Sequence, residues 1–480
     1  MDGEVADAPP QDRTPRFAKL SEKATLWSLI AILAWVQFPL GSNRPWSWSL
    51  LAILVSLTWF AWLPAALGET AHLASLLKRV AFPAGLMLAV LIWAQLQCVS
   101  YTPLAWHNPI WRIAALALGR PIPGAISINP FVTETELMKL ATYVAIGWLT
   151  YAVAQRYENA HSLFIAVFVV AVVYAAYGIV LSTLGTSQLT LLEGLPPPYG
   201  RDVSAGFVSK NSFATFTGLG LLAGLAMLVD SGRHGIVATR GWRTHLRTLV
   251  QFAFGRGAFR VAGMFTLVAA LVASDSRAGL IATLLGLVSM FCLALAIAHR
   301  YGRVRWTLIG GTCAGTIIVG LFLINGHDLQ SRFENLIDTA GAGELRPVMW
   351  GAAIRGLADH PLLGTGLGTY GDAYHLYANS FVPFVVDRAH NDYLEFALGL
   401  GLPASGLWIL ALLTLVVQCA WAALTRRRRQ IFSMTAVGAS VLIAFHSIFD
   451  FSLQMPAVAV LYAIIMGLGV GQLRSSHETP

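Results

Sequence analysis

Arg388-Ala-His-Asn-Asp-Tyr-Leu-Glu-Phe-Ala-Leu-Gly-Leu-Gly-Leu-Pro-Ala-Ser-Gly-Leu-Trp408 is a run of polar and ionisable residues that passes directly into an apolar segment ending near Leu424. The apolar part is long enough to cross about 30 Å of hydrocarbon. The junction therefore predicts that His390, Asp392 and Glu395 lie at the edge of a membrane.

His390 is the residue of this stretch best suited to proton transfer, because the unperturbed pKa of imidazole is close to neutral pH. The other interpretation is a structural histidine at the start of a helix, with Asn391 or Asp392 as the helix cap. Spacing alone does not decide between the two, so the positions of the other polar residues become important.

The composition is that of a membrane protein. The chain has 480 residues, of which 56% are hydrophobic and 12% are charged, whereas soluble chains are about 25% charged. Apolar runs long enough to span a bilayer recur throughout the sequence. We therefore expect an all-α polytopic membrane protein of about twelve transmembrane helices, at residues 26–40, 48–67, 80–97, 137–154, 162–186, 211–229, 261–274, 279–298, 306–325, 403–424, 431–449 and 454–472.

The expected domain organisation follows from these spans. Residues 1–25 are predicted to be a disordered cytoplasmic tail and not a cleavable signal peptide, because their first 20 residues are polar. Residues 26–472 form the membrane domain and 473–480 a second cytoplasmic tail. Residues 326–402, between the ninth and tenth helices, form the largest periplasmic loop.

The distribution of positive charge supports this topology. With the N-terminus inside, the expected inner segments hold 21 of the 32 lysines and arginines, the outer ones hold 10, and Lys139 lies at a boundary. This bias matches the positive-inside rule. The net charge of +8 is thus explained by membrane topology, with anionic lipid as the expected partner and no nucleic acid. Segment 230–260 is either an interfacial amphipathic helix or a basic loop.

Metal and disulfide chemistry is not indicated. The four cysteines lie in or beside apolar runs, and none has the spacing of metal ligands.

Polar residues stand out at two further outer positions. The segment from Tyr199 to Asn211 contains Arg201, and a tight turn between two apolar spans contains Arg277. Each lies at the outer end of an expected helix, so both are predicted to converge with the histidine stretch. Two guanidinium groups beside a helix N-terminus suit a phosphate-rich anion. The alternatives are lipid snorkelling for Arg201 and an ion pair with Asp275 for Arg277.

The long outer segment contains further local structure. Residues 349–358 have helical periodicity. The glycines of residues 360–370 are expected to let that loop lie flat against the membrane.

At these residues the chain resembles the O-antigen ligase superfamily, which also includes O-antigen polymerases and protein O-oligosaccharyltransferases. The matching motifs are Arg201…Gly206-Phe207…Asn211, Ser274-Asp-Ser-Arg277-Ala-Gly, Arg346…Trp350…His360-Pro-Leu-Leu-Gly-Thr-Gly, His390-Asn-Asp-Tyr-Leu-Glu395…Gly401-Leu-Pro403…Gly406 and, as in some exopolysaccharide-linked members, Ser127-Ile-Asn-Pro130…Thr133. The resemblance covers about residues 125–425 and does not distinguish a ligase from a polymerase.

The resemblance implies a GT-C-like fold and a metal-independent, inverting glycosyltransferase without a cofactor. Such an enzyme lies in the bacterial inner membrane with its active site facing the periplasm. The implied donor is an undecaprenyl-pyrophosphate-linked glycan, and the implied acceptor is lipid A-core. The alternative is a polymerase that extends O-antigen or exopolysaccharide repeats.

The resemblance also implies roles for individual residues. Arg201 and Arg277 would bind the pyrophosphate, and His390 would deprotonate or orient the acceptor hydroxyl. Glu395 or Asp392 would hold the imidazole, or else have an ordinary structural role at the start of the helix. The implied substrate-binding residues are Lys210, Asn211, Arg346, Arg388, Asn391 and Tyr393. Lys210 departs from the small or polar residue that commonly precedes the asparagine, and it would add a third phosphate contact.

A small-anion transporter is the rival from another class. Transporters place their charged residues near the bilayer midplane, often at broken helices and within inverted repeats. Here the charged residues cluster at helix ends and no inverted repeat is apparent, so the sequence favours the enzyme.

Overall fold

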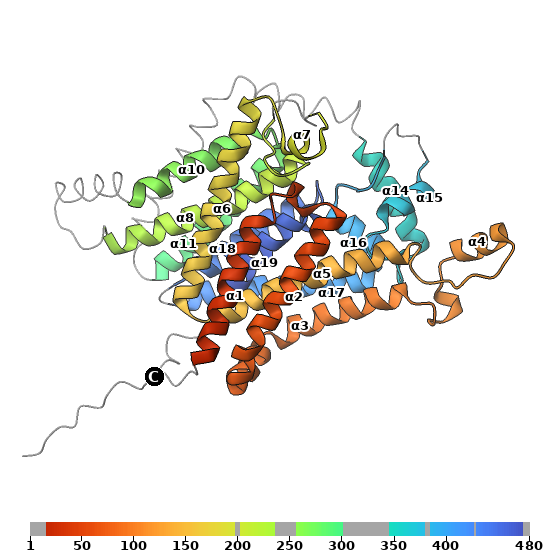
Figure 1. Ribbon diagram of the computed structural model, residues 1–480, viewed down its shortest axis with the longest axis horizontal. Helices are drawn as coiled ribbons and strands as arrows, with labels where there is room; N and C mark the ends of the chain where they lie inside the picture. Colours follow the sequence, from red (N-terminus) through yellow and green to blue (C-terminus); the bar gives the residue numbers. More distant parts are fainter. Residues whose placement is uncertain are drawn as a thin grey trace, which may run out of the picture.

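The computed structural model describes residues 16–196, 202–235, 256–300, 345–379, 385–426 and 429–473. In these ranges every regular element is a helix (Figure 1), which confirms the all-α class. The helices are α1 (Arg16–Trp35), α2 (Pro45–Gly68), α3 (Thr70–Cys98), α4 (Ile110–Leu118), α5 (Pro130–Val153), α6 (Tyr157–Thr183), α7 (Gln188–Glu193), α8 (Lys210–Gly235), α10 (Arg256–Ala273), α11 (Arg277–Arg300), α14 (Arg346–Asp359), α15 (Tyr370–Tyr377), α16 (Asp392–Leu400), α17 (Leu402–Thr425), α18 (Ile431–His446) and α19 (Pro456–Val470), with short 3-10 turns η1 (Leu40–Ser42), η2 (Leu104–Trp106) and η3 (Ser452–Gln454).

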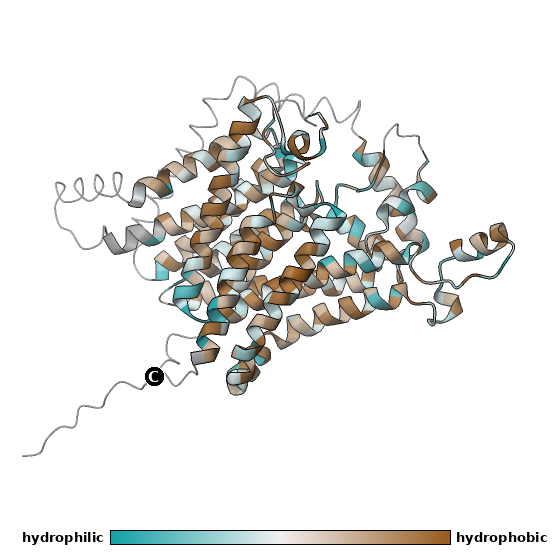
Figure 2. Ribbon diagram, viewed as in Figure 1, coloured by the Kyte–Doolittle hydropathy of each residue, from teal (hydrophilic) through white to brown (hydrophobic). Residues whose placement is uncertain are grey.

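Several of these helices are suited to span a membrane. Within the described ranges six are long and apolar enough, namely α2, α3, α6, α8, α11 and α17, and α10, α18 and α19 are shorter apolar helices. Figure 2 shows hydrophobic residues along the long helices and hydrophilic ones mainly at their ends. Eleven of the twelve expected spans coincide with a helix. The expected span 306–325 lies outside the described residues, so the count of twelve stays a prediction.

The first helix begins earlier than the sequence indicated. Helix α1 starts at Arg16, so residues 16–25 are helical and the expected tail was drawn too long. Contacts with other helices explain this difference. The Ser21 hydroxyl donates a hydrogen bond to the Ala61 carbonyl in α2, and Glu22 forms an ion pair of 2.9 Å with Arg156.

Helix α5 also starts earlier, at Pro130 and not near residue 137. The Asn129 side chain accepts a hydrogen bond from the Val132 amide, and proline occupies the first helical position. Asparagine as N-cap followed by proline is a preferred way to begin a helix. The Asn-Pro pair therefore adds nearly two turns to α5 beyond the apolar run.

Helix α19 lies in the centre of the bundle, where nearly all of its residues are buried. It packs against α5, α18 and α8. A Cβ atom on Gly467 of α19 would lie 2.7 Å from the Gly147 carbonyl oxygen of α5. This crossing therefore depends on small residues, as is common between membrane helices.

The described part of the long outer segment is itself folded. Helices α14, α15 and α16 pack around a small apolar cluster that includes Met349, Tyr370 and Leu398. Helices α14 and α15 lie at the right of Figure 1. Helix α14 confirms the helix predicted over residues 349–358.

The glycine-rich loop of residues 360–370 packs against protein, which corrects the expectation that it lies flat against the membrane. The Ile128 amide donates a hydrogen bond of 2.9 Å to the Thr365 carbonyl. Gly366 has a φ of 106°, and a Cβ atom there would lie 2.3 Å from Ser127 Oγ. The glycine is therefore needed because the loop runs directly over the start of α5.

Candidate functional site

His390 lies in an unusual backbone conformation just before α16. Its φ is 52°, in the left-handed region that costs a residue with a side chain about 1 kcal/mol or more. The following residues are firmly held. The Asn391 side-chain oxygen caps α16 by accepting a hydrogen bond from the Leu394 backbone amide at 3.0 Å. The Asn391 side-chain nitrogen donates to the Ile448 carbonyl. The chain around His390 is thus fixed to the loop between α18 and α19.

The same loop supplies the partner of the imidazole. His390 Nδ1 lies 2.9 Å from Asp450 Oδ1, and Asp450 is fully buried while the His390 side chain is 34% exposed. An ionised carboxylate can only accept, so Nδ1 carries the hydrogen and donates it. In this tautomer Nε2 carries no hydrogen and keeps its lone pair. It forms no hydrogen bond with the described residues. The pair therefore holds a basic nitrogen at an accessible position.

The structure assigns other tasks to the two carboxylates that were expected to hold the imidazole. Asp392 accepts hydrogen bonds from the Ser447 hydroxyl at 2.7 Å, the Leu453 amide and the Gln454 side chain. Glu395 accepts from the Ala389 amide at 2.6 Å. Both organise the backbone around His390, and neither contacts its ring.

Asp450 was not predicted as a site residue from the sequence, because it directly follows an apolar run that was interpreted only as a membrane span. It follows α18 closely, in the sequence Ser447-Ile-Phe-Asp450. An ionisable residue at the end of a membrane span is a functional candidate by default. That rule would have identified it, although it could not have named His390, sixty residues away, as its partner.

Burial changes the acidity of the supporting carboxyls. Burial raises the pKa of Glu395 to about 7, against the attraction of the neighbouring Arg388 guanidinium. Burial likewise raises the pKa of Asp392 to about 6, although its hydrogen bonds from Ser447, Leu453 and Gln454 oppose the shift.

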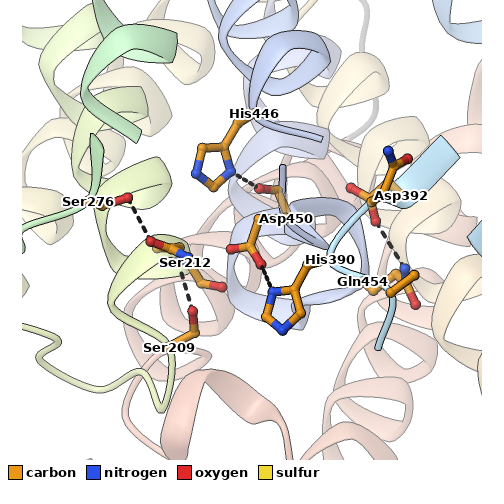
Figure 3. Close-up of polar contacts among 12 residues, drawn as sticks. Ser209, Ser212, Ser276, His390, Asp392, His446, Asp450 and Gln454 are labelled. Atoms are coloured by element: carbon orange, nitrogen blue, oxygen red, sulfur yellow. Dashed lines mark hydrogen bonds and ion pairs between the residues drawn. The ribbon is translucent and has the colours of Figure 1, made fainter. Parts of the chain in front are cut away.

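Helix α8 contacts both the turn before α11 and the end of α18, which leads into the loop that contains Asp450. The Ser276 hydroxyl donates to Asn211 Oδ1 at 2.8 Å. One turn further along α8, the Thr215 hydroxyl lies 3.0 Å from His446 Nδ1. Figure 3 shows Ser209, Ser212 and Ser276 on one side of His390, Asp450 and His446, with Asp392 and Gln454 on the other. The structure thus brings together the start of α8, the start of α11 and the loop between α18 and α19.

Arg277 is the first residue of α11. It is half-buried, and it forms neither a hydrogen bond nor an ion pair with any residue in the described ranges. The expected alternative, an ion pair with Asp275, is not formed. Asp275 instead lies 3.3 Å from the Lys210 ammonium.

Lys210, the first residue of α8, lies between two carboxylates. Its Nζ is 2.8 Å from Asp202 and 3.3 Å from Asp275. Its positive charge is therefore largely balanced within the protein. Arg201, the second expected phosphate ligand, lies outside the described residues.

The remaining expected substrate-binding residues differ in their surroundings. Arg346 begins α14 and is close enough to His446 for its charge to act on that imidazole. The Tyr393 hydroxyl donates to the Ala444 carbonyl at 2.8 Å. Arg388 is largely buried among carboxylates and lies over the Phe451 ring.

The described residues contain no group of three or more histidine, cysteine, aspartate or glutamate side chains arranged to hold a metal ion. The functional groups in this region are an imidazole, carboxylates, hydroxyls and guanidinium groups.

The fold and site define a helical membrane protein in which buried Asp450 is paired with the partly exposed imidazole of His390, just before α16. Residues 262–409 match the family model described as O-Antigen ligase. The chain thus carries a domain of the O-antigen ligase superfamily, which confirms the resemblance seen in its motifs and implies an enzyme of the glycosyltransferase type. The matched segment includes Arg277 and His390, whereas Asp450 lies beyond it. A search of curated proteins finds no match.

The raised pKa of Glu395 predicts a pH-dependent stability. The ordinary pKa of this carboxyl is 4.5, so its contribution to the free energy of unfolding is fully present below about pH 4.5 and is lost as the pH rises through about 7. Each pKa unit is equivalent to about 1.4 kcal/mol. We expect the thermal midpoint of the protein in detergent to fall between pH 6 and 7.5, and Glu395→Gln to flatten that fall.

The matched control for this measurement is Glu134→Gln, because Glu134 is exposed and its removal should leave the slope unchanged. Asp392, whose pKa is raised to about 6, also contributes to the fall just above pH 6, so the difference between the wild type and Glu395→Gln is what measures the part due to Glu395. A Glu395→Gln protein with the wild-type slope would show that this carboxyl is already ionised at pH 6.

Proposed function

We propose that this protein is an inner-membrane glycosyltransferase that transfers a glycan from undecaprenyl pyrophosphate to lipid A-core at the periplasmic face. The observation that carries the proposal is the pairing of His390 with buried Asp450, in the same region as the start of α11, where Arg277 has no carboxylate partner among the described residues. Membership of residues 262–409 in the O-antigen ligase family supports it.

In the proposed reaction His390 acts as the base. The acceptor hydroxyl gives its proton to Nε2 as its oxygen attacks the anomeric carbon of the donor. The bond between that carbon and the pyrophosphate oxygen breaks, with inversion, and undecaprenyl pyrophosphate leaves. Asp450, 2.9 Å from Nδ1, keeps the ring in the required tautomer and stabilises the imidazolium that forms.

Arg277 binds the leaving pyrophosphate in the proposed reaction. Its guanidinium and the free amides at the start of α11 form a site for the pyrophosphate oxygens. Because Arg277 has no carboxylate partner in the described ranges, its whole charge is available as negative charge develops on the leaving group. Arg201 is the second expected ligand. Lys210 would contact phosphate only by exchanging Asp202 or Asp275 for it.

Other residues are proposed to orient the substrates. The Asn211 side-chain oxygen is engaged by Ser276, so its amide group remains to donate to a sugar or phosphate. Arg346, at the start of α14, is proposed to contact the glycan. Asn391 and Tyr393 act through the hydrogen bonds that fix the start of α16.

A polymerase of O-antigen or exopolysaccharide repeats is the second candidate. It would use the same groups, with another lipid-linked glycan as acceptor. The motif Ser127-Ile-Asn-Pro130, which resembles exopolysaccharide-linked members, favours it. In the structure this motif supports the glycine-rich loop through Ser127 and Ile128.

Reconstitution is the experiment that tests the function. The purified chain, in liposomes with an undecaprenyl-pyrophosphate glycan and lipid A-core, should yield one transfer product per acceptor, detected by gel and mass spectrometry. His390→Ala should abolish transfer while still inserting in the membrane, because the imidazole acts on the acceptor.

Other results of the reconstitution would revise the proposal. A ladder of polyprenyl-linked repeats with untouched lipid A-core would make the protein a polymerase. No product with either acceptor would favour a small-anion transporter. Full transfer by His390→Ala would remove His390 as the base.

Arg277→Lys should fold normally and lose most of the activity. An ammonium keeps the charge but cannot form the forked contact with two phosphate oxygens. We expect a loss of roughly 100-fold in kcat, as for removal of one group that stabilises developing negative charge. The measurement is single-turnover transfer in liposomes, and activity close to wild type would show that Arg277 does not touch the pyrophosphate.

Asp450→Asn should lower kcat by roughly 100-fold or more, because an amide can present its donor to Nδ1 and so select the wrong tautomer of His390. The KM for the donor should change little. The comparison variant is Asp372→Asn, on α15, whose carboxylate accepts from Asn129 at 3.0 Å outside this pair. Equal kinetics for the two variants would contradict the role of Asp450.

A further inference from the structure

The residues before and after His390 in the chain are both anchored by side-chain contacts, and the two sets of contacts differ. On the C-terminal side, Asp392 is bound by the loop between α18 and α19. On the N-terminal side, the Ala389 amide donates to Glu395, and Arg388 is drawn into a group of buried charges. The purpose of that group is not explained by the transfer reaction itself.

The buried group consists of Glu136 and Lys139 on α5 together with Arg388 and Glu395. Lys139 Nζ lies 2.6 Å from Glu136. The Arg388 guanidinium lies 3.5 Å from Glu136 and 3.5 Å from Glu395, and it also donates to Gln454. Every side chain in the group is at most 15% exposed.

Such a group is costly to bury. The desolvation of paired charges commonly equals or exceeds their attraction, so a buried ion pair is poor evidence of stabilisation. A role in fixing one conformation is the better-attested reason to keep one. The conformation next to this group is the left-handed backbone of His390, two residues after Arg388.

Contacts with neighbouring elements hold the part of α5 around Glu136 in place. Lys139 Nζ lies over the Trp48 ring of α2, 4.7 Å from its centroid. On the other side, a Cβ atom on Gly368 would lie 2.2 Å from Glu136 Cγ, so the glycine-rich loop closes directly over this carboxylate. The Ser127 and Thr133 hydroxyls, 2.8 Å apart, join the segment before α5 to the first turn of the helix, and a Cβ atom on Gly366 of the glycine-rich loop would lie close to both side chains.

We propose that Glu136 is a positioning residue for His390, acting through Arg388. The carboxylate of α5 fixes the guanidinium, the guanidinium and Glu395 fix the backbone of residues 388 and 389, and this backbone sets the direction of the imidazole. The inference rests on the proposed function, since its effect is read in glycan transfer. It also assigns Arg388 to the support of the site and not to the substrate.

Glu136→Gln is the direct test, with Glu134→Gln as the matched control. Both residues lie in the first turns of α5, and Glu134 is exposed. Because small displacements of a reacting group are costly, we expect Glu136→Gln to lower kcat by roughly 10- to 100-fold. The KM for the donor should stay within about twofold, and the control should behave as wild type.

A double variant separates positioning from folding. Glu136→Gln alone removes one negative charge from the buried group, whereas Glu136→Gln with Arg388→Gln removes one charge of each sign and so leaves the net charge as in the wild type. The double variant should regain the wild-type thermal midpoint in detergent and still transfer slowly, because the link between α5 and His390 is missing.

Three results would overturn the inference. Wild-type kcat in Glu136→Gln would show that the carboxylate does not position His390. A raised donor KM with unchanged kcat would show that Arg388 binds substrate. Recovery of kcat in the double variant would show that only the charge balance matters. Failure of the wild-type protein to transfer any glycan would count against the proposed function instead, and is recognised in the same assay.

Discussion

A buried carboxylate must be paired, and the pairing of Asp450 with His390 is the interaction on which the site depends. Asp450 has no exposed side-chain surface, so an unpaired charge there would be strongly unfavourable. The imidazole meets this need while keeping its second nitrogen accessible. The constraint also explains the backbone, because a histidine at φ 52° is held only where its surroundings leave no alternative.

The surroundings are assembled from segments far apart in the chain. The start of α5 contacts the glycine-rich loop and Arg388, and the start of α16 contacts the loop after α18. Each contact is a hydrogen bond or a close backbone approach, so the arrangement is precise. The long apolar helices supply the rigid frame, and their ends supply the polar groups. The polar groups of the candidate site thus lie where the helices stop.

Much of the fold and part of the site could be predicted from the sequence. Apolar runs located eleven helices, and the polar junction identified His390, because both signals are local. The partner of the imidazole could not be found this way, since Asp450 and His390 meet only through tertiary packing. The glycine-rich loop was misplaced for a related reason. A sequence shows that a loop can approach an apolar surface closely, but it does not show whether that surface is lipid or α5.

Under the proposed function, the distribution of charge would let one region both bind a pyrophosphate and release it. Lys210 lies between Asp202 and Asp275, and Arg388 lies between Glu136 and Glu395, so both cations are largely neutralised. Arg277 has no such partner among the described residues. In a medium of low dielectric constant, several free cations would bind a pyrophosphate too tightly to release it. Confining free positive charge to few positions would stabilise the negative charge that develops in the transition state while limiting the affinity for the pyrophosphate product.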